Sequence, residues 1–192
     1  MSKNRIAVFA SGSGTNAEEI FKYFKGHPSI EVVLLLSNNS RAVALERADK
    51  LGITSMVFTK EQFRDSDEVL NWLRKFRVTH IVLAGFLWLI PRNLLKAFPN
   101  RIINIHPALL PKFGGKGMFG MKVHELVKAT GELETGITIH RVNEKYDDGE
   151  ILFQEICLLD SHDTPEQIAA KVNRLEYAHY PRVIEEWIVG SR

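Results

Sequence analysis

The sequence has 192 residues, the size of one globular domain. Hydrophobic residues make up 45% and charged residues 25%, values that exclude a disordered tail or a collagen-like repeat. Its 25 Lys and Arg and 23 Asp and Glu side chains give a net charge of +2, which is too balanced for a protein that binds nucleic acid through its overall charge.

Strand patterns and helix patterns alternate through the first half of the sequence. Continuous apolar runs predict strands buried on both faces at 5–10, 31–37, 53–58, 80–86 and 101–106. Apolar residues at helical spacing predict helices over 17–25, 42–50 and 61–77. This alternation indicates an α/β fold with a doubly wound, mainly parallel sheet and helices on both faces.

The pattern changes after residue 107. A glycine-rich segment at 113–120 precedes a short helix over 123–129, and two late strands at 134–142 and 151–159 make that part of the sheet mixed. A final helix begins at the start signal Asp163-Thr164-Pro165-Glu166 and runs to about Val189. Because no linker or repeat interrupts the chain, we predict a single domain over residues 1–192.

The chain has one cysteine, Cys157, which excludes an intrachain disulfide and a thiolate zinc cage. We expect it to be a buried thiol in the last strand. The histidines lack the spacing of metal ligands, so we predict no catalytic metal. No apolar segment reaches 18 residues and no secretory signal is visible, so we expect a cytoplasmic protein that binds no membrane.

A loop rich in glycine and hydroxyl groups, 11–17, follows the first strand and leads into a helix. Free N–H groups at a helix start attract an anion, so the loop predicts phosphate binding. Gly12, Gly14 and Ala17 also fit the spacing of a dinucleotide loop. The second strand ends in 37–41 without an acidic residue, which argues against NAD, while Arg41 leaves NADP open.

Two polar side chains lie near the end of the fifth strand. Residues two apart on a strand point the same way, so Asn104 and His106 project to one side. An amide donor beside an imidazole suits an oxyanion that develops in acyl transfer. If the turn at 146–149 folds over this end of the sheet, Asp147 could face His106, raise its pKa and fix its tautomer.

The apolar run 83–90 continues past the end of the fourth strand. Such a run either forms ordinary core or lines a pocket for a flat aromatic ligand. From the sequence alone these two interpretations of the run are equally open.

Several segments together resemble the phosphoribosylglycinamide formyltransferase family. They are SGSGTN at 11–16, LAGF-LWLI at 83–90, INIHPALLPKFGG at 103–115 and YDDG at 146–149. They occur in the family's order and cover nearly the whole chain. The resemblance implies a formyltransferase fold with a phosphate-binding half at about 1–100 and a folate-binding and catalytic half at about 80–192.

The resemblance also implies roles for single residues. Asn104, His106 and Asp147 match the catalytic residues of the family. Glu176 matches a glutamate that binds the ribonucleotide substrate. Residues that match the phosphate loop are Ser13, Gly14, Thr15 and Asn16.

The matching folate segment consists of Leu87, Trp88, Leu89 and Ile90. Asn104 belongs to the folate site as well, Glu144 lies near that pocket, and Lys60 falls near a family arginine that contacts folate. The segment 113–120 departs from the family pattern, so no substrate contact is carried over to it.

The activity implied by the resemblance is transfer of a formyl group from 10-formyltetrahydrofolate to the amine of glycinamide ribonucleotide. The implied partners are these two small molecules, with no nucleic acid, and the chain is expected to be a monomer or a weak homodimer. Alternatives are a formyltetrahydrofolate hydrolase, which usually carries an extra N-terminal domain, and methionyl-tRNA formyltransferase, which usually carries a C-terminal one. An NADP-dependent oxidoreductase and a folate sensor without turnover are further alternatives.

Overall fold

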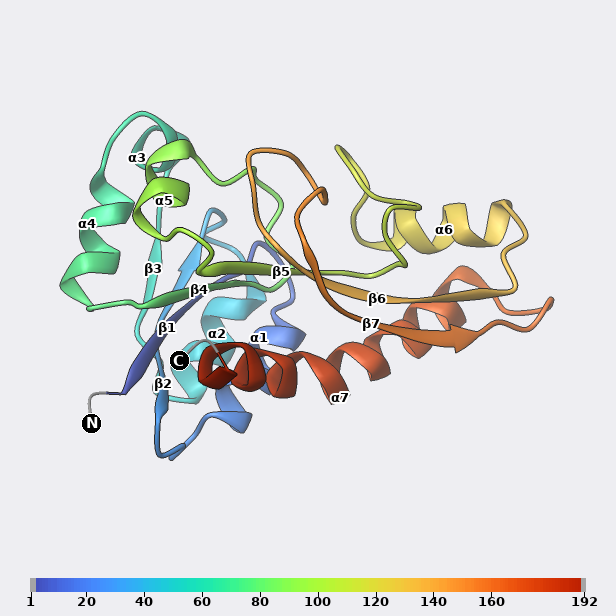
Figure 1. The fold of residues 1–192 in the computed structure, drawn as a ribbon, viewed down its shortest axis with the longest axis horizontal. Coiled ribbons are helices and arrows are strands. Elements are labelled where there is room, and N and C mark those ends of the chain that lie inside the picture. Colours follow the sequence, from blue (N-terminus) through green and yellow to red (C-terminus); the bar gives the residue numbers. More distant parts are fainter. Residues whose placement is uncertain (1–2, 191–192) are drawn as a thin grey trace.

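The computed structural model describes residues 3–190, and one sheet of seven strands runs through this part of the chain (Figure 1). The strands are β1 (Asn4–Phe9), β2 (Ile30–Ser37), β3 (Ser55–Val57), β4 (His80–Leu83), β5 (Ile102–His106), β6 (Glu134–Arg141) and β7 (Ile151–Leu158). Their order is β3-β2-β1-β4-β5-β6-β7. Strands β1 to β5 pair in parallel, whereas β6 and β7 are antiparallel, which confirms the mixed sheet.

Helices cover both faces of the sheet (Figure 1). They are α1 (Thr15–Tyr23), α2 (Val43–Lys50), α3 (Lys60–Arg64), α4 (Glu68–Lys75), α5 (Arg92–Ala97), α6 (Met121–Ala129) and α7 (Pro165–Gly190). Because strand side chains alternate, Ile6 and Val8 pack in a core with α1, α2, α6 and α7. Ala7 and Phe9 pack on the other face with α3, α4 and α5.

The predicted helix over 61–77 is wrong in one respect, because it is two helices. Thr59 and Gln62 form a capping box that begins α3 at Lys60. The Ser66 hydroxyl then donates to the Gln62 carbonyl and accepts from the Glu68 N–H, so one side chain serves the end of α3 and the start of α4. Helix α5 has no counterpart among the predicted helices, and β4 ends at Leu83 rather than at residue 86.

Cys157 is only partly buried, which corrects the expectation of a buried thiol. It lies on β7, whose only partner strand in the described sheet is β6. Residues along β7 are therefore partly buried or exposed, whereas β4, in the middle of the sheet, is buried throughout. An apolar run cannot distinguish these two positions.

The sheet reverses its winding direction between β1 and β4, which are neighbours but are separated by β2 and β3 in the chain. Ligands of open α/β sheets bind at such a point, outside the carboxyl ends of the strands. The loops after β1 and β4 are joined here, because the Ser11 N–H donates to the Gly85 carbonyl at 3.0 Å.

The long helix α7 packs under this region. It begins as predicted at Pro165, where Thr164 and Gln167 exchange side-chain-to-backbone hydrogen bonds. Further along, the Tyr180 hydroxyl donates to the Leu83 carbonyl at 2.8 Å and ties the helix to the end of β4. Helix α7 therefore carries side chains such as Glu176 to the loops of the first strands.

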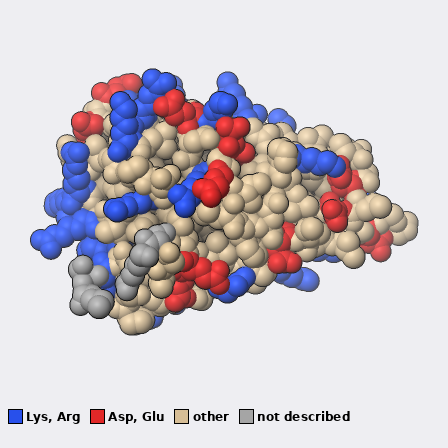
Figure 2. Space-filling view, in the orientation of Figure 1, with Lys and Arg blue, Asp and Glu red and all other residues tan. Residues whose placement is uncertain are grey.

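No helix among residues 3–190 is both long enough and apolar enough to cross a membrane. On the face shown in Figure 2, acidic and basic side chains are interspersed and much of the middle is uncharged. This distribution agrees with the small net charge of +2.

Candidate active site

The loop after β1 presents the start of α1 to a cavity. Gly14 is the N-cap of α1 with φ 70°, and no side chain caps the first turn. A Cβ atom at Gly14 would lie 2.5 Å from the Ala44 Cβ, so glycine is needed here for both conformation and space. Arg47 donates to the Ser13 carbonyl at 2.8 Å and ion-pairs with Glu18, which fixes the loop against α2. The uncapped N–H groups are suited to bind an anion.

Helix α7 closes one side of this loop with a buried carboxyl group. The Asn16 amide donates to the Glu176 carboxylate at 2.9 Å, and Glu176 is 6% exposed. Burial raises the pKa of Glu176 to about 7, although the Asn16 hydrogen bond partly lowers it. Glu176 and Asn173 both line the cavity.

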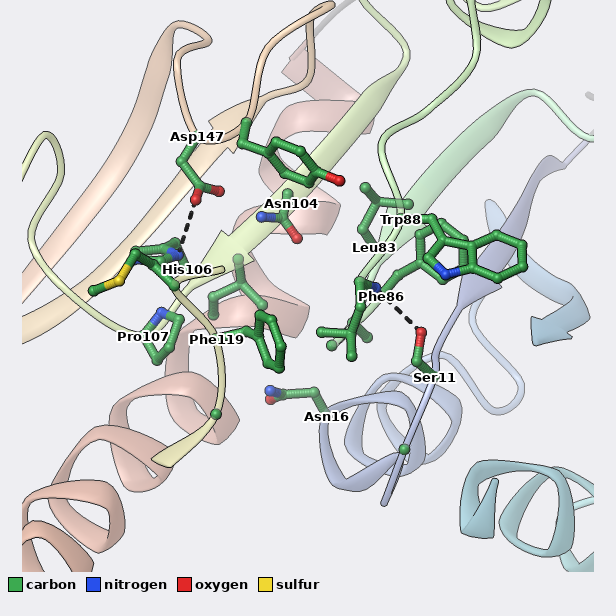
Figure 3. Close-up of a pocket in the computed structure, with 18 of the residues that line it drawn as sticks. Ser11, Asn16, Leu83, Phe86, Trp88, Asn104, His106, Pro107, Phe119 and Asp147 are labelled. Atoms are coloured by element: carbon green, nitrogen blue, oxygen red, sulfur yellow. Dashed lines mark hydrogen bonds and ion pairs between the residues drawn. The ribbon is translucent and has the colours of Figure 1, made fainter. Parts of the chain in front are cut away.

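The polar side chains of β5 lie near the middle of the same cavity (Figure 3). The His106 Nδ1 lies 3.6 Å from a carboxylate oxygen of Asp147, and its Nε2–H donates to the Phe113 carbonyl at 2.8 Å. The other carboxylate oxygen of Asp147 lies 3.5 Å from the His140 Nε2. The turn after β6 thus folds over the end of the sheet, as the sequence hypothesis requires.

Sequence reasoning missed His140. It stands opposite Asn104 across the β5–β6 ladder, and the two side chains are joined at 3.1 Å between the Asn104 Nδ2 and the His140 Nε2. Nothing in its local sequence marks it, because only the pairing of β6 with β5 brings it to the site. The pairing register of β5 and β6 is the signal that would have indicated His140 as a site residue.

Burial has the larger effect on the pKa of His106, although Asp147 raises it, as the sequence hypothesis requires. Burial lowers it below the usual range, and the Asp147 carboxylate and the Phe113 carbonyl offset only part of that effect. The neutral form of His106 is therefore favoured in the unliganded chain. For Asp147 itself, burial raises the pKa, but the two histidines and the Gly115 N–H outweigh it, and the net pKa lies below its ordinary value.

The segment after β4 forms another wall. The Leu87 N–H donates to the Ser11 hydroxyl at 3.1 Å, which connects this segment to the anion loop. The Trp88 ring packs edge-on against Phe58, and the Arg64 guanidinium lies 5.8 Å above it. The run 83–90 thus contributes both to the core and to the lining of the cavity.

These parts enclose a cavity of about 600 Å³, a volume suited to small organic ligands. Most of the predicted site residues line it, in three groups: 13–16; 87–90; and Asn104, His106, Asp147 and Glu176. Lys60 and Glu144 do not line it: Lys60 opens α3 beyond the edge strand β3, and exposed Glu144 pairs with Arg92 at 3.0 Å. The glycine-rich segment, for which no contact was predicted, does line it through Gly115–Gly120.

The sequence matches the formyl transferase family over residues 4–184. The chain belongs to this family. Within residues 3–190 no group of three or more His, Cys, Asp or Glu side chains is arranged to hold a metal ion, and the metal-free mechanism stays a prediction.

Relatives within the formyl transferase family carry one recurring name. The chain is 44% identical over 188 residues to "Phosphoribosylglycinamide formyltransferase, chloroplastic" of Arabidopsis thaliana, covering 95% of this chain and 64% of that protein. It is 36% identical to the phosphoribosylglycinamide formyltransferase of Bacillus subtilis, covering 95% and 93%. The chain thus spans less than two thirds of the plant relative but nearly all of the bacterial one.

A solved formyltransferase structure supports the same fold. The crystal structure of phosphoribosylglycinamide formyltransferase from Bacillus halodurans aligns with a TM-score of 0.87 at 34% identity, covering 98% of this chain and 97% of that one. The resemblance that the sequence motifs indicated, and the formyltransferase fold that it implied, are confirmed.

Proposed function

We propose that this chain transfers the formyl group of 10-formyltetrahydrofolate to the amine of 5'-phosphoribosylglycinamide. The products are formylglycinamide ribonucleotide and tetrahydrofolate. The observation that carries the proposal is the single cavity that joins an uncapped helix start, an Asn-His-Asp cluster and an apolar wall. The names of the relatives support the same activity.

The ribonucleotide binds at the α1 side of the cavity. Its phosphate takes the free N–H groups at the start of α1, with the hydroxyls of Ser13 and Thr15 as further donors. The Glu176 carboxylate accepts from a sugar hydroxyl, because it is buried there with one protein hydrogen bond, from Asn16. The amine of the substrate then reaches the middle of the cavity.

The folate binds along Leu87–Ile90. This segment follows β4 and lines the cavity, where a flat ring with donors and acceptors along its edge can pair with its main-chain groups. Asn104, at the adjacent strand end, lies beside the formyl group. Since Lys60 and Glu144 lie outside the lining, we assign them no folate contact.

The reaction is direct transfer. The substrate amine attacks the formyl carbon, and the formyl oxygen becomes an oxyanion that Asn104 and His106 stabilise. The His106 Nε2–H donates to the Phe113 carbonyl in the unliganded chain, so segment 113–115 must shift before this N–H can reach the oxyanion. A proton then passes from the attached amine to the departing folate nitrogen, and the carbon–nitrogen bond to the folate breaks.

Asp147 supports this step through His106. In the empty site burial keeps the pKa of His106 low, but the oxyanion adds a second negative charge beside the ring and favours its protonated form. Asp147 faces the Nδ1 atom, so it orients the ring and stabilises the charge as it develops. The two substrates held together in one cavity gain a further rate advantage from proximity.

We also infer that residues 1–100 supply the phosphate side and residues 80–192 most of the folate and catalytic side. The chain works as a monomer or weak homodimer in the cytoplasm. Sedimentation at micromolar concentration tests the assembly state. A sedimentation coefficient that corresponds to a tight oligomer would contradict it.

The test is to incubate the purified chain with 10-formyltetrahydrofolate, with and without the ribonucleotide, and to follow tetrahydrofolate. We expect tetrahydrofolate only when the ribonucleotide is present. Equal release without it would show a hydrolase. No release in either case would contradict the formyltransferase proposal.

A further inference from the structure

His140 has a specific relationship to Asn104 that the proposed reaction does not yet use. Their backbones are register partners on β5 and β6, and the side chains meet at 3.1 Å. Both ring nitrogens of His140 are engaged, because its Nδ1 lies 2.8 Å from the Arg141 carbonyl. A carbonyl oxygen only accepts, so Nδ1 carries a proton in either charge state of the ring.

Because Nδ1 always carries a proton, the charge state of His140 decides whether Nε2 accepts or donates a hydrogen bond. In neutral His140, Nε2 has no proton and can only accept, so Asn104 must donate with its amide nitrogen, and the amide oxygen is left toward the cavity. Figure 3 shows this arrangement: in that view the Asn104 nitrogen points to the side of Asp147 and the oxygen points away from it. In the imidazolium form Nε2–H is a donor that faces the Asn104 NH₂ group, and two donors repel, so we expect Asn104 to turn its oxygen to His140 and its NH₂ group to the cavity.

The two orientations have opposite chemical consequences. An amide oxygen that faces the cavity repels an oxyanion, whereas an amide N–H group stabilises one. We propose that His140 is a positioning residue for formyl transfer, and that a proton on its Nε2 turns the Asn104 amide so that it donates to the developing oxyanion. This inference rests on the proposed function for its chemical meaning, but the pairing itself exists without any substrate.

The charged groups around His140 are compatible with a proton on its Nε2 atom. Asp147, in the turn after β6, offers an oxygen 3.5 Å from Nε2, and His106 on β5 faces the other oxygen of the same carboxylate. On β7 the register partner of His140 is the apolar Ile151. In the free site one carboxylate thus faces two imidazoles, and a proton on one ring disfavours a proton on the other. When the oxyanion forms, two negative charges face the two rings, so both can carry a proton.

The pairing is tested directly by ¹⁵N NMR of the imidazole nitrogens in the intact protein. In the free protein, with His140 neutral, we expect Nδ1 protonated and Nε2 unprotonated. A folate analogue with a tetrahedral gem-diol carbon in place of the formyl carbon, added with the ribonucleotide at the same pH, should protonate Nε2 as well. The proposal would be overturned if His140 in the free protein carried its proton on Nε2 alone, or if its Nε2 stayed unprotonated in the complex.

Variants give a second readout. His140→Leu should lower kcat by less than the roughly 10²–10³-fold loss expected for removal of an oxyanion donor, and should leave both KM values nearly unchanged. His140→Gln, whose amide can donate at the Nε2 position at any pH, should restore most of kcat and remove the contribution of His140 to its pH profile. In an Asn104→Ala background, His140→Leu should cause no further loss. Independent, multiplying losses would show that His140 acts on something other than Asn104.

The experiments separate this inference from the proposed function. If the wild-type chain forms no formylated ribonucleotide, the proposed function fails, whereas the ¹⁵N spectrum of the free protein still decides the His140 tautomer. If transfer occurs and His140→Leu is as active as wild type, only the positioning role is overturned.

Discussion

Asn16 and Glu176 are separated by 160 residues, yet the amide of one donates to the buried carboxylate of the other at 2.9 Å. The contact joins the first turn of α1 to α7 at the wall of the cavity. A carboxyl group held in this way favours a proton in the empty site, since burial raises its pKa to about 7 from 4.5.

The first prediction concerns the stability cost of that burial. Between pH 4.5 and 7 the unfolded chain releases the Glu176 proton while the folded chain keeps it, so this group lowers stability as pH rises through that range. Glu176→Gln cannot ionise, and should stabilise the unliganded chain by on the order of 3 kcal/mol at pH 8 but little at pH 4.

Thermal melts of both proteins across this pH range measure the effect. Glu166→Gln, an exposed change near the start of the same helix, is the matched control and should show no gain at high pH. Glu176→Gln should also raise the KM for the ribonucleotide. An equal pH dependence in wild type and Glu176→Gln would contradict the raised pKa.

The second prediction concerns Asp147. Asp147→Asn keeps the shape of the side chain and an oxygen for the Gly115 N–H, so both substrates should bind nearly normally. Turnover should fall by roughly 10²–10³-fold, because the support of the charged His106 is gone. The pKa of His106 should fall further, since Asp147 raises it now. Wild-type turnover in this variant would leave Asp147 as a simple turn residue.

The third prediction separates the two glycines of the anion loop. Gly14→Ala should destabilise the fold, because its Cβ would lie 2.5 Å from the Ala44 Cβ and φ is positive. Gly12→Ala meets no atom within 4 Å and should leave the melting temperature nearly unchanged. We expect it to raise the KM for the ribonucleotide more than that for the folate. Equal weakening of both substrates would show that the loop does not bind the phosphate.

The fourth prediction concerns the wall after β4. A folate analogue should slow hydrogen exchange at the Leu87–Ile90 amides, and NADPH should not. Ser11→Ala removes the acceptor of the Leu87 N–H and should speed exchange at that amide in the free chain. Protection by NADPH instead would support an oxidoreductase.

The sequence predicts the parallel core of the fold well, because β1, β2, β4 and β5 are runs of apolar residues buried on both faces. It predicts β7 less well, because its burial depends on its place at the edge of the sheet. The split between α3 and α4 depends on one serine hydroxyl, which no periodicity reveals.

The residues of the candidate site also fall into those that local sequence predicts and those that it does not. Residues at strand ends, such as Asn104 and His106, follow from local sequence and the rule that ligands bind at the carboxyl ends of strands. His140 does not, because its place opposite Asn104 comes from a long-range antiparallel register. For Lys60 the prediction rests on sequence similarity alone, and the structure places this residue outside the cavity lining, at the start of α3.

The most direct test of the account follows the formyl carbon itself. The purified chain is given 10-formyltetrahydrofolate with a ¹³C-labelled formyl group, together with 5'-phosphoribosylglycinamide, and the products are read by mass spectrometry. We predict that the label appears on the glycinamide nitrogen in step with tetrahydrofolate, and that Asp147→Asn slows both equally. Label that appears as free formate, or a ribonucleotide that stays unlabelled while folate is consumed, would contradict the account.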